Sequence, residues 1–389
     1  MAKNLERLIL LLLLTFWSLA WDYQHFGEFQ RTGRTKILLA GAAALAAIRF
    51  ARSWHWTVGL FYFYFVANWL HFGFQPWVLP ISGKQFLFET AGLEEVIGLT
   101  ATLFLVPIIA ERISRRLIEN TILLASLVHC AIGALNLAGI YPFLATKVSP
   151  EGNLPIGLLG QQTLLGPFLA FAFVLSIIRM FEAVRGEGDP GAYAALALLN
   201  FAIALLTKSS MTYGAMAAGL AALFVFGLGL LPAIMMAALS ATALLVASWF
   251  DPNIAWHSGR MEPWKDAYSL HQLRPWFGFG VGGWEPISQM IKEVRGYQFP
   301  WTYLHCEPLQ TLFELGRVGV GILAAAGVAL LGRLHFLYLF RDRENLTWIV
   351  GLAVFGTNSL ANFTLHLVPH GPLFALCAYQ IFNSRGSRG

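Results

Sequence analysis

The stretch TLLGPFLAFAFVLSII, residues 163–178, has no charged side chain over its whole length. A bilayer core about 30 Å thick takes about 20 apolar residues per helix, so a run of this kind predicts a membrane-spanning helix. The rest of the 389-residue chain repeats the pattern: 57% of its residues are hydrophobic, only 12% are charged, and its mean hydropathy is +0.61. Soluble domains have about a quarter of their residues charged. We therefore expect an all-α, polytopic integral membrane protein.

Further apolar runs, separated by charged breaks, extend the prediction to about twelve transmembrane helices in a single membrane domain over residues 1–389. The expected spans lie near residues 8–21, 37–50, 55–72, 93–110, 120–140, 163–178, 193–206, 213–230, 232–250, 317–332, 346–358 and 372–383. With both termini inside, fourteen Lys and Arg residues fall in the short inner loops and six in the short outer loops. The positive-inside rule therefore predicts cytoplasmic termini.

The first span also resembles a signal peptide, because Ser18 and Ala20 are spaced like a cleavage site. We expect it to be uncleaved, since cleavage would leave eleven spans and move the new N-terminus to the outer side.

Composition excludes several other classes of protein. The three cysteines, Cys130, Cys306 and Cys377, have no CxxC spacing, so no disulfide framework or zinc cage is expected. The net charge of +5 comes from Lys and Arg residues scattered between apolar runs and not gathered on a patch. Membrane orientation accounts for them better than nucleic-acid binding does, and we expect no nucleic-acid partner.

One long polar segment, residues 251–316, is expected as a periplasmic loop that carries most of the active site. It holds five of the thirteen tryptophans, together with several arginines, lysines and histidines. Tryptophan favours the headgroup level of a membrane, and arginine binds phosphate oxygens in a bidentate way. The simpler alternative is an interfacial lid with an aromatic belt.

Three patterns follow one another in this segment. Gly259-Arg260 precedes Trp264, a Pro- and Gly-rich turn occupies residues 275–283, and a pattern that begins with His305 ends in Glu-Leu-Gly at residues 314–316. In this order, and within one long outer loop, they resemble the O-antigen ligase and O-antigen polymerase superfamily of polytopic glycan transferases. The resemblance covers about residues 155–375.

The resemblance implies a GT-C-like membrane fold and an inverting glycosyltransferase of the bacterial inner membrane. Its donor would be a glycan on a polyprenyl (undecaprenyl) pyrophosphate, its acceptor a hydroxyl at the periplasmic face, and membrane lipids its surroundings. Cys306, Thr163 and Lys208 stand where members commonly have other residues. The acceptor therefore stays open between lipid A core, which we favour, another lipid-linked repeat (a polymerase) and protein (an O-oligosaccharyltransferase).

A pyrophosphate leaving group needs charge compensation, from a metal ion or from fixed cations. Asp251 and Asp266 are the only aspartates in the loop, and no Asp-x-Asp occurs. We therefore expect no metal and no other cofactor. Arg260 and Lys208 are predicted to hold the pyrophosphate, with Arg274 as a third cation.

His305 is the predicted catalytic base, since neutral imidazole accepts a proton from an attacking hydroxyl. Pro308 favours a helix start at this point, which places His305 just before a helix N-terminus, where the macrodipole disfavours imidazolium. Glu307 and Glu314 are seven residues apart on one helical face, and either is expected to orient His305 or a basic ligand of the phosphate.

Two upstream amides, Gln161 and Gln162, precede an apolar helix and are predicted to bind sugar. A helix cap is an equal alternative for them. The other candidates also have structural alternatives: Arg260 pairing with Glu262, Lys208 snorkelling from a helix end, Arg274 shaping its turn, His305 capping or packing, and Glu314 pairing with Arg317 three residues later.

The stretch from Asn358 to His366 is predicted to line the acceptor side, as its counterpart in the superfamily does. His366 and His370 are four residues apart, but Pro369 breaks the helix that would align them as metal ligands. A transporter or flippase for lipid-linked sugar is the alternative of a different class. It would place ionisable residues at mid-span, whereas here they gather at one surface, with Glu94 and Glu95 as exceptions.

Overall fold

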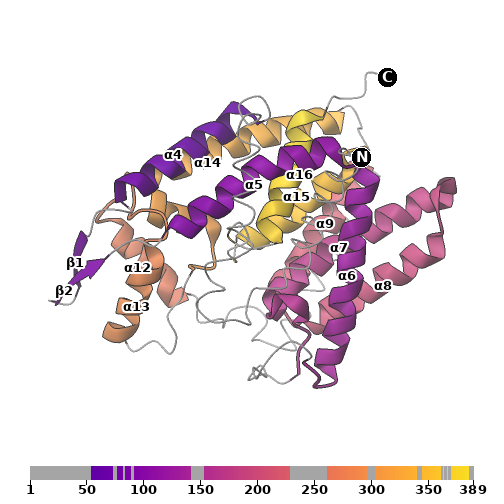
Figure 1. The fold of residues 1–389 in the computed structure, drawn as a ribbon, viewed down its shortest axis with the longest axis horizontal. Coiled ribbons are helices and arrows are strands. Elements are labelled where there is room, and N and C mark those ends of the chain that lie inside the picture. Colours follow the sequence, from indigo (N-terminus) through magenta and orange to yellow (C-terminus); the bar gives the residue numbers. More distant parts are fainter. Residues whose placement is uncertain are drawn as a thin grey trace, which may run out of the picture.

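The computed structural model describes residues 54–72, 77–81, 84–88, 92–141, 153–227, 261–295, 303–339, 344–360, 362, 366 and 369–384. These residues form a helical bundle with one short hairpin (Figure 1). The helices are α4 (Trp56–Phe72), α5 (Leu93–Arg112), α6 (Arg115–Leu137), α7 (Gln162–Glu182), α8 (Pro190–Leu206), α9 (Ser210–Gly227), α12 (Met261–His271), α13 (Trp284–Arg295), α14 (Glu307–Leu339), α15 (Leu346–Ser359) and α16 (His370–Asn383).

Three smaller elements complete the described structure. The antiparallel strands β1 (Trp77–Ile81) and β2 (Lys84–Phe88) form a hairpin that the sequence analysis did not predict. A 3₁₀ turn, η2 (Gly157–Leu159), precedes α7, and a π turn, η3 (Ala183–Glu187), follows it.

Eight of the twelve predicted spans lie within the described residues and each coincides with a helix, and span 213–230 coincides with α9 over its described part, residues 213–227. Spans 8–21, 37–50 and 232–250 lie outside the described residues. Among the described helices, four are long and apolar enough to cross a membrane: α6, α7 with its extension to Gly186, α9 and α14. These helices support a helical membrane protein, and the count of twelve stays a prediction.

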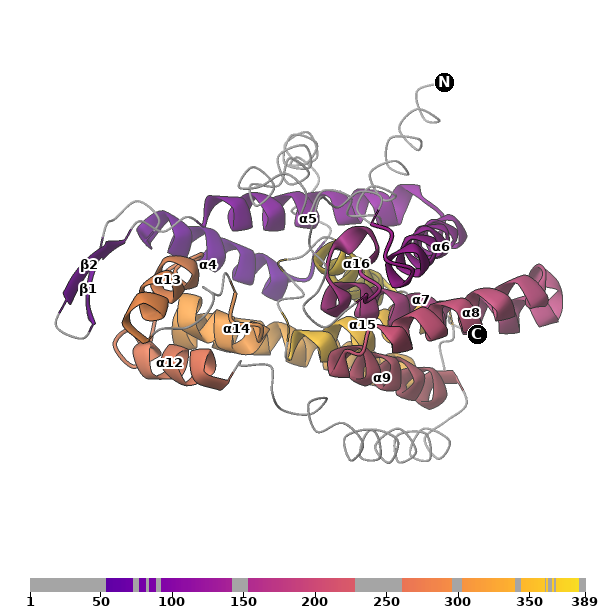
Figure 2. The ribbon, with the colours of Figure 1, turned by 90° about the horizontal axis from the view of Figure 1, so that it is seen from below.

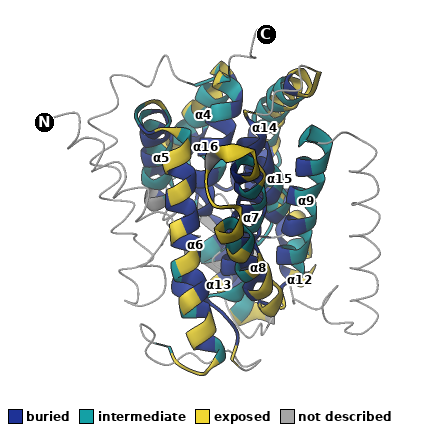
Figure 3. Cartoon of the chain, turned by 90° about the vertical axis from the view of Figure 1, so that its right-hand side faces the viewer, coloured by how far each residue is buried: buried dark blue, intermediate teal, exposed yellow. Residues whose placement is uncertain are grey.

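Helix α7 is the centre of the bundle because it is apolar on all its faces. Phe168 and Phe171 are fully buried, and the Phe171 ring packs edge-on against Phe355 of α15, with centroids 5.3 Å apart. Helices α6, α8, α9 and α15 surround α7, and α6 shows an alternation of buried and exposed residues (Figure 3). A Cβ atom on Gly351 of α15 would overlap the Sγ of Cys377 in α16, so only glycine permits this approach.

Part of the predicted long loop folds into a second, smaller core. Trp284, Ile287 and Ile291 lie on one face of α13 and pack with Phe279 and Phe313. Figure 2 shows α12, α13 and the hairpin at one end of the molecule, beside α4 and the start of α14, and far from α8. The described part of the predicted long loop, residues 251–316, is two helices, a turn and the first residues of α14, and its periplasmic location stays a prediction.

Candidate active site

A break in α14 is the centre of the site region. Gly316 has φ 67° and ψ −170°, which is not helical. At such a break, backbone groups lose their helical partners, and leaving them unpaired is costly in an apolar setting. Here residues 275–280 supply new partners: Phe279 and Gly280 donate to the carbonyls of Phe313 and Glu314 at 3.0 and 2.9 Å.

The same turn also accepts hydrogen bonds from beyond the break. The amides of Arg317 and Val318 donate to the carbonyls of Pro275 and Trp276 at 2.9 and 3.1 Å. A Cβ atom at Gly316 would overlap the Trp276 carbonyl, so the close approach of these two backbones requires a glycine. The Gly-rich turn is thus the structural complement of the break in α14, and not a free loop.

The segment before α14 carries His305 and is held on both sides. The indole Nε1 of Trp264 in α12 donates to the carbonyl of Leu304 at 2.5 Å. The amide of Leu304 donates to Oε1 of Gln310 at 2.8 Å, and the amide of Gln310 donates to the carbonyl of Cys306 at 2.8 Å. Burial raises the pKa of the Cys306 thiol, so this side chain is not a thiolate at neutral pH.

His305 itself is half-buried and adopts a left-handed backbone conformation, with φ 53°. Non-glycine residues seldom adopt this conformation, which costs about 1 kcal/mol or more unless surrounding contacts maintain it. Because α14 begins at Glu307, the prediction that His305 stands just before a helix N-terminus is confirmed.

A buried polar cluster surrounds this segment, and we call Glu95, Tyr303, Glu307, Glu314 and His366 the glutamate–histidine cluster. His366 Nδ1 lies 3.1 Å from Oε1 of Glu307, and its Nε2 lies 3.9 Å from Oε2 of Glu95. The Tyr303 hydroxyl donates to Oε1 of Glu95 at 2.7 Å, and the Tyr303 and His366 rings are 4.9 Å apart. Glu314 interacts electrostatically with both His366 and Glu95.

The charge of His366 is set by these carboxylates. Burial alone would lower the pKa of its imidazole, but Glu307 and Glu95 outweigh this effect and raise the pKa to about 9. His366 is therefore protonated at neutral pH and is not a general base there. The expectation that Glu307 orients His305 is modified, since Glu307 binds His366.

Glu314 does not form the pair with Arg317 that helical spacing allowed. Its carboxylate accepts a hydrogen bond from Nε2 of Gln310 at 2.6 Å, and the Arg317 guanidinium lies over the Trp276 ring, 5.6 Å from its centroid. Gly316 interrupts the helix between them, so residues 314 and 317 do not share a helical face. Glu307 and Glu314 do share one, as predicted, because both face His366.

Arg274 stands at the start of the turn, between two aromatic rings. Its guanidinium lies 5.5 Å from the centroid of Phe72 and 5.6 Å from that of Phe279. Burial lowers its pKa, yet an arginine stays charged at neutral pH. These contacts favour the alternative role of Arg274 in shaping the turn.

The loop after α15 brings Gln161 and Gln162 to the same end of the bundle as His305. Asn362 Nδ2 donates to the carbonyl of Thr163, in the first turn of α7, at 3.2 Å, and His366 follows four residues later. The side chain of Gln161 stands at the N-cap position of α7 but makes no capping hydrogen bond. The capping alternative is therefore wrong for Gln161.

Lys208 lies at this end as well, in the turn between α8 and α9. It is exposed and has φ 50°. Thr212, four residues later, packs against Gly166 in the first turns of α7, which positions the turn. Arg260 lies outside the described residues.

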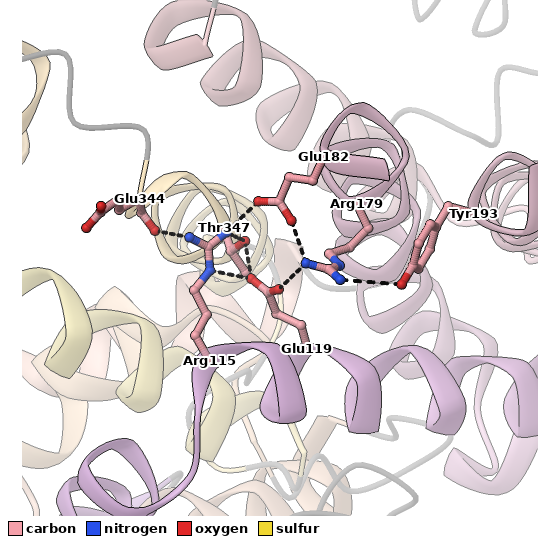
Figure 4. Close-up of polar contacts among 7 residues, drawn as sticks. All are labelled: Arg115, Glu119, Arg179, Glu182, Tyr193, Glu344 and Thr347. Carbon is pink, nitrogen blue, oxygen red and sulfur yellow. Dashed lines mark hydrogen bonds and ion pairs between the residues drawn. The ribbon is translucent and has the colours of Figure 1, made fainter. Parts of the chain in front are cut away.

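A second buried cluster lies at the other end of α5 and is drawn in Figure 4. Its members, which we call the arginine cluster, are Arg115, Glu119, Arg179, Glu182 and Thr347. Glu119 accepts from Nε of Arg115 at 2.6 Å and from the Thr347 hydroxyl at 2.7 Å, and it lies 3.7 Å from Nη1 of Arg179. Glu182 accepts from both arginines, at 3.3 and 2.5 Å. These contacts join α6, α7 and α15.

Glu95, Tyr303 and His366 belong to the glutamate–histidine cluster but were not predicted from the sequence as site residues. Glu95 was noted only as an exception to the charge pattern, and His366 only as part of the stretch after α15 and as half of a rejected metal-ligand pair with His370. A carboxylate at the start of an apolar run is costly to bury without a partner, and this was the available signal for Glu95. Within the described residues, no group of three or more His, Cys, Asp or Glu is arranged to hold a metal ion.

Comparison of the chain with protein-family models and with curated proteins found no match.

Proposed function

We propose that this protein is a glycosyltransferase that moves a glycan from a polyprenyl pyrophosphate to an acceptor hydroxyl, in the manner of O-antigen ligases. In this proposal the chain crosses a bacterial inner membrane about twelve times, with both termini in the cytoplasm. The site then faces the periplasm, and lipid A core is the favoured acceptor over a lipid-linked repeat or a protein.

One observation carries the proposal: the described parts of three patterns that are separate in the sequence, with Trp264 standing for the first, meet in one unit. Trp264 binds the carbonyl of Leu304, next to His305, and the turn at residues 275–280 pairs with the backbone of residues 313–318. The first contact holds the residue before His305, and the others hold the helix that begins two residues after it. Buried convergence of this kind is typical of positions that are held for chemistry.

In the proposed reaction, neutral His305 accepts the proton of the acceptor hydroxyl as its oxygen attacks the anomeric carbon. The glycosidic bond to the diphosphate breaks, and the pyrophosphate leaves with its bonding electrons. Arg260 and Lys208 compensate its charge, and Arg274 contributes less directly by holding the turn. Gln161 and Gln162 lie where they can hydrogen-bond sugar.

A lipid-linked sugar transporter is supported less well by the distribution of buried charge. A transporter places its ionisable residues near the bilayer midplane. In the described residues, Glu119 lies in the second turn of α6, Arg179 in the last turn of α7 and Glu307 in the first turn of α14. These three charges are at helix ends, which suits chemistry at a membrane surface, while His129 in α6 and Glu314 beside the break in α14 are buried ionisable residues away from the ends.

The test compares His305→Ala with His335→Ala, a control at an exposed histidine near the far end of the same helix. Purified protein in lipid nanodiscs receives a polyprenyl pyrophosphate glycan, candidate acceptors one at a time, and EDTA. We expect His305→Ala to lower product formation about 100-fold or more while donor binding is retained, and His335→Ala to match the wild type.

Mass spectrometry of the product identifies the acceptor. Equal activity of the two variants would contradict the assigned base, and product that forms only after magnesium is added would contradict the metal-independent mechanism. A wild type that moves the lipid across a bilayer without forming product would favour the transporter.

A further inference from the structure

The segment that carries His305 contacts the pair Glu95 and His366 at both its ends, Glu95 at one end and His366 at the other. Tyr303, two residues before His305, donates to Oε1 of Glu95 at 2.7 Å. Glu307, two residues after it, lies 3.1 Å from Nδ1 of His366. Glu95 and His366 are themselves 3.9 Å apart. The contacts therefore close a ring from Tyr303 through Glu95 and His366 to Glu307, with His305 at the middle of the enclosed backbone.

We infer that His366 is a positioning residue, which holds the backbone of His305 in its left-handed conformation by linking Glu307 in α14 to Glu95 in α5. The role of His305 as a base rests on the proposed function. The linkage itself does not, because it is a statement about the backbone of residues 303–307.

Three features of the ring support this inference. The left-handed conformation of His305 is unfavourable for a residue with a Cβ atom, so it needs support from outside the segment. The ion-paired side chains of the ring are largely shielded from water, at 4–14% exposed, where an ion pair with hydrogen bonds is lost only at a large cost. Finally, the local hydrogen bonds of Gln310 with Leu304 and Cys306 fix the segment to α14 alone, whereas the ring also fixes it to α5 and to His366.

The groups that face His366 determine how the linkage responds to pH. Glu95 faces it from α5, Glu307 and Glu314 face it from α14, and the Tyr303 ring lies against it. Every charged group among them is a carboxylate, which accounts for a pKa of about 9 at His366. The linkage is therefore complete at neutral pH and weakens as the pH passes about 9.

The first test reads the backbone directly and does not depend on catalysis. His366→Gln removes the cation, and His55→Gln is a matched control at a half-buried histidine that stacks on Phe382. By hydrogen exchange, the amides of Leu304 and Gln310 should exchange about tenfold faster in His366→Gln and unchanged in His55→Gln. Unchanged exchange in both variants would overturn the inference.

If His366→Gln does not fold, Tyr303→Phe breaks the ring at its other end by removing one hydroxyl. It should accelerate the exchange of the same two amides, by a smaller factor. Exchange that stays at the wild-type rate in Tyr303→Phe would equally overturn the inference.

The second test separates positioning from general stability. We expect His366→Gln to lower kcat for glycan transfer about tenfold with little change in the KM for the donor, since misplacement of a reacting group affects the chemical step. The fall of wild-type kcat near pH 9 should be absent in this variant. An unchanged kcat, or a variant that keeps the alkaline fall, would contradict the positioning role.

If the wild type forms no product under any condition, the proposed function is contradicted, but the positioning role of His366 is not. The exchange experiment still decides whether His366 holds the segment, so the two failures are distinguishable.

Discussion

The arginine cluster and the glutamate–histidine cluster are both buried at helix ends, but their charges are balanced differently. In the arginine cluster, two guanidinium groups face two carboxylates. In the glutamate–histidine cluster, three carboxylates face one imidazole. A balanced buried cluster holds helices together, whereas an unbalanced one shifts the pKa of its members, as functional sites do. The comparison favours a supporting role for the first cluster and a role at the candidate site for the second.

The two clusters also differ in the elements that supply them. The arginine cluster joins the ends of α6, α7 and α15, which are regular helices. The glutamate–histidine cluster takes Tyr303 and His366 from short segments outside the helices. Functional side chains are often carried by irregular segments that a rigid scaffold positions. Helix α5 carries Glu95 in its first turn and ends at Arg112, three residues before Arg115 of the arginine cluster, so about 25 Å of helical rise separates Glu95 from Arg112.

The largest expected effect is that of Glu119→Gln in the arginine cluster. Loss of this carboxylate leaves the two arginines short of one anion, and the side chain of Arg179 is only 4% exposed. We expect a loss of about 3–5 kcal/mol in the free energy of unfolding, measured with denaturant. Lys265→Ala is the control, because its pair with Glu262 is exposed and should contribute under about 1 kcal/mol. Similar losses in both variants would contradict the supporting role.

The next largest expected effect is a pH dependence of the free energy of unfolding, which comes from His366 in the glutamate–histidine cluster. His366 has a folded pKa of about 9, above its unfolded value near 6.5. Its contribution is therefore complete below about pH 6.5 and is lost as the pH rises through 9, at most about 3 kcal/mol. Unfolding of the wild type and of His366→Gln, compared from pH 6 to pH 10, measures it. Parallel stability curves would show that His366 is not held as a cation.

The smallest effect, about 2 kcal/mol, is expected for Gly316→Ala. An added methyl group would meet the Trp276 carbonyl at a positive φ, so the turn at residues 275–280 should separate from α14. Gly321→Ala, in the same helix and with open space around its Cβ position, should be neutral or slightly stabilising. Denaturant unfolding and the glycan-transfer assay together check this. Equal free energies of unfolding and equal transfer rates in both variants would contradict the structural role of the break in α14.

Much of the architecture could be predicted from the sequence because apolar runs report helices directly. The run at residues 163–178 became α7, and the basic residues at 112–116 and 179 lie together at one end of the bundle. The start of α14 after His305 was also predictable, since Pro308 indicates it locally. These are properties of neighbouring residues.

Long-range contacts could not be predicted in the same way. Glu95 and His366 are more than 250 residues apart, and nothing in either neighbourhood indicates the other. The pairing of Glu314 with Arg317 was expected from helical spacing and failed because Gly316 ends the regular helix between them. The turn at residues 275–280 was recognised in the sequence. Its role could not be predicted, because it depends on pairing with backbone groups that the break in α14 exposes.

The pairing of the turn at residues 275–280 with the break in α14 has a consequence for the synthesis of the chain. Ribosomes finish the turn before they begin α14, so the partner for the interrupted helix already exists when the helix emerges. An α14 inserted without it would bring unpaired amides and carbonyls toward lipid tails, which is costly. The Gly-rich turn therefore precedes, in the order of synthesis, the helix whose interrupted backbone it pairs with.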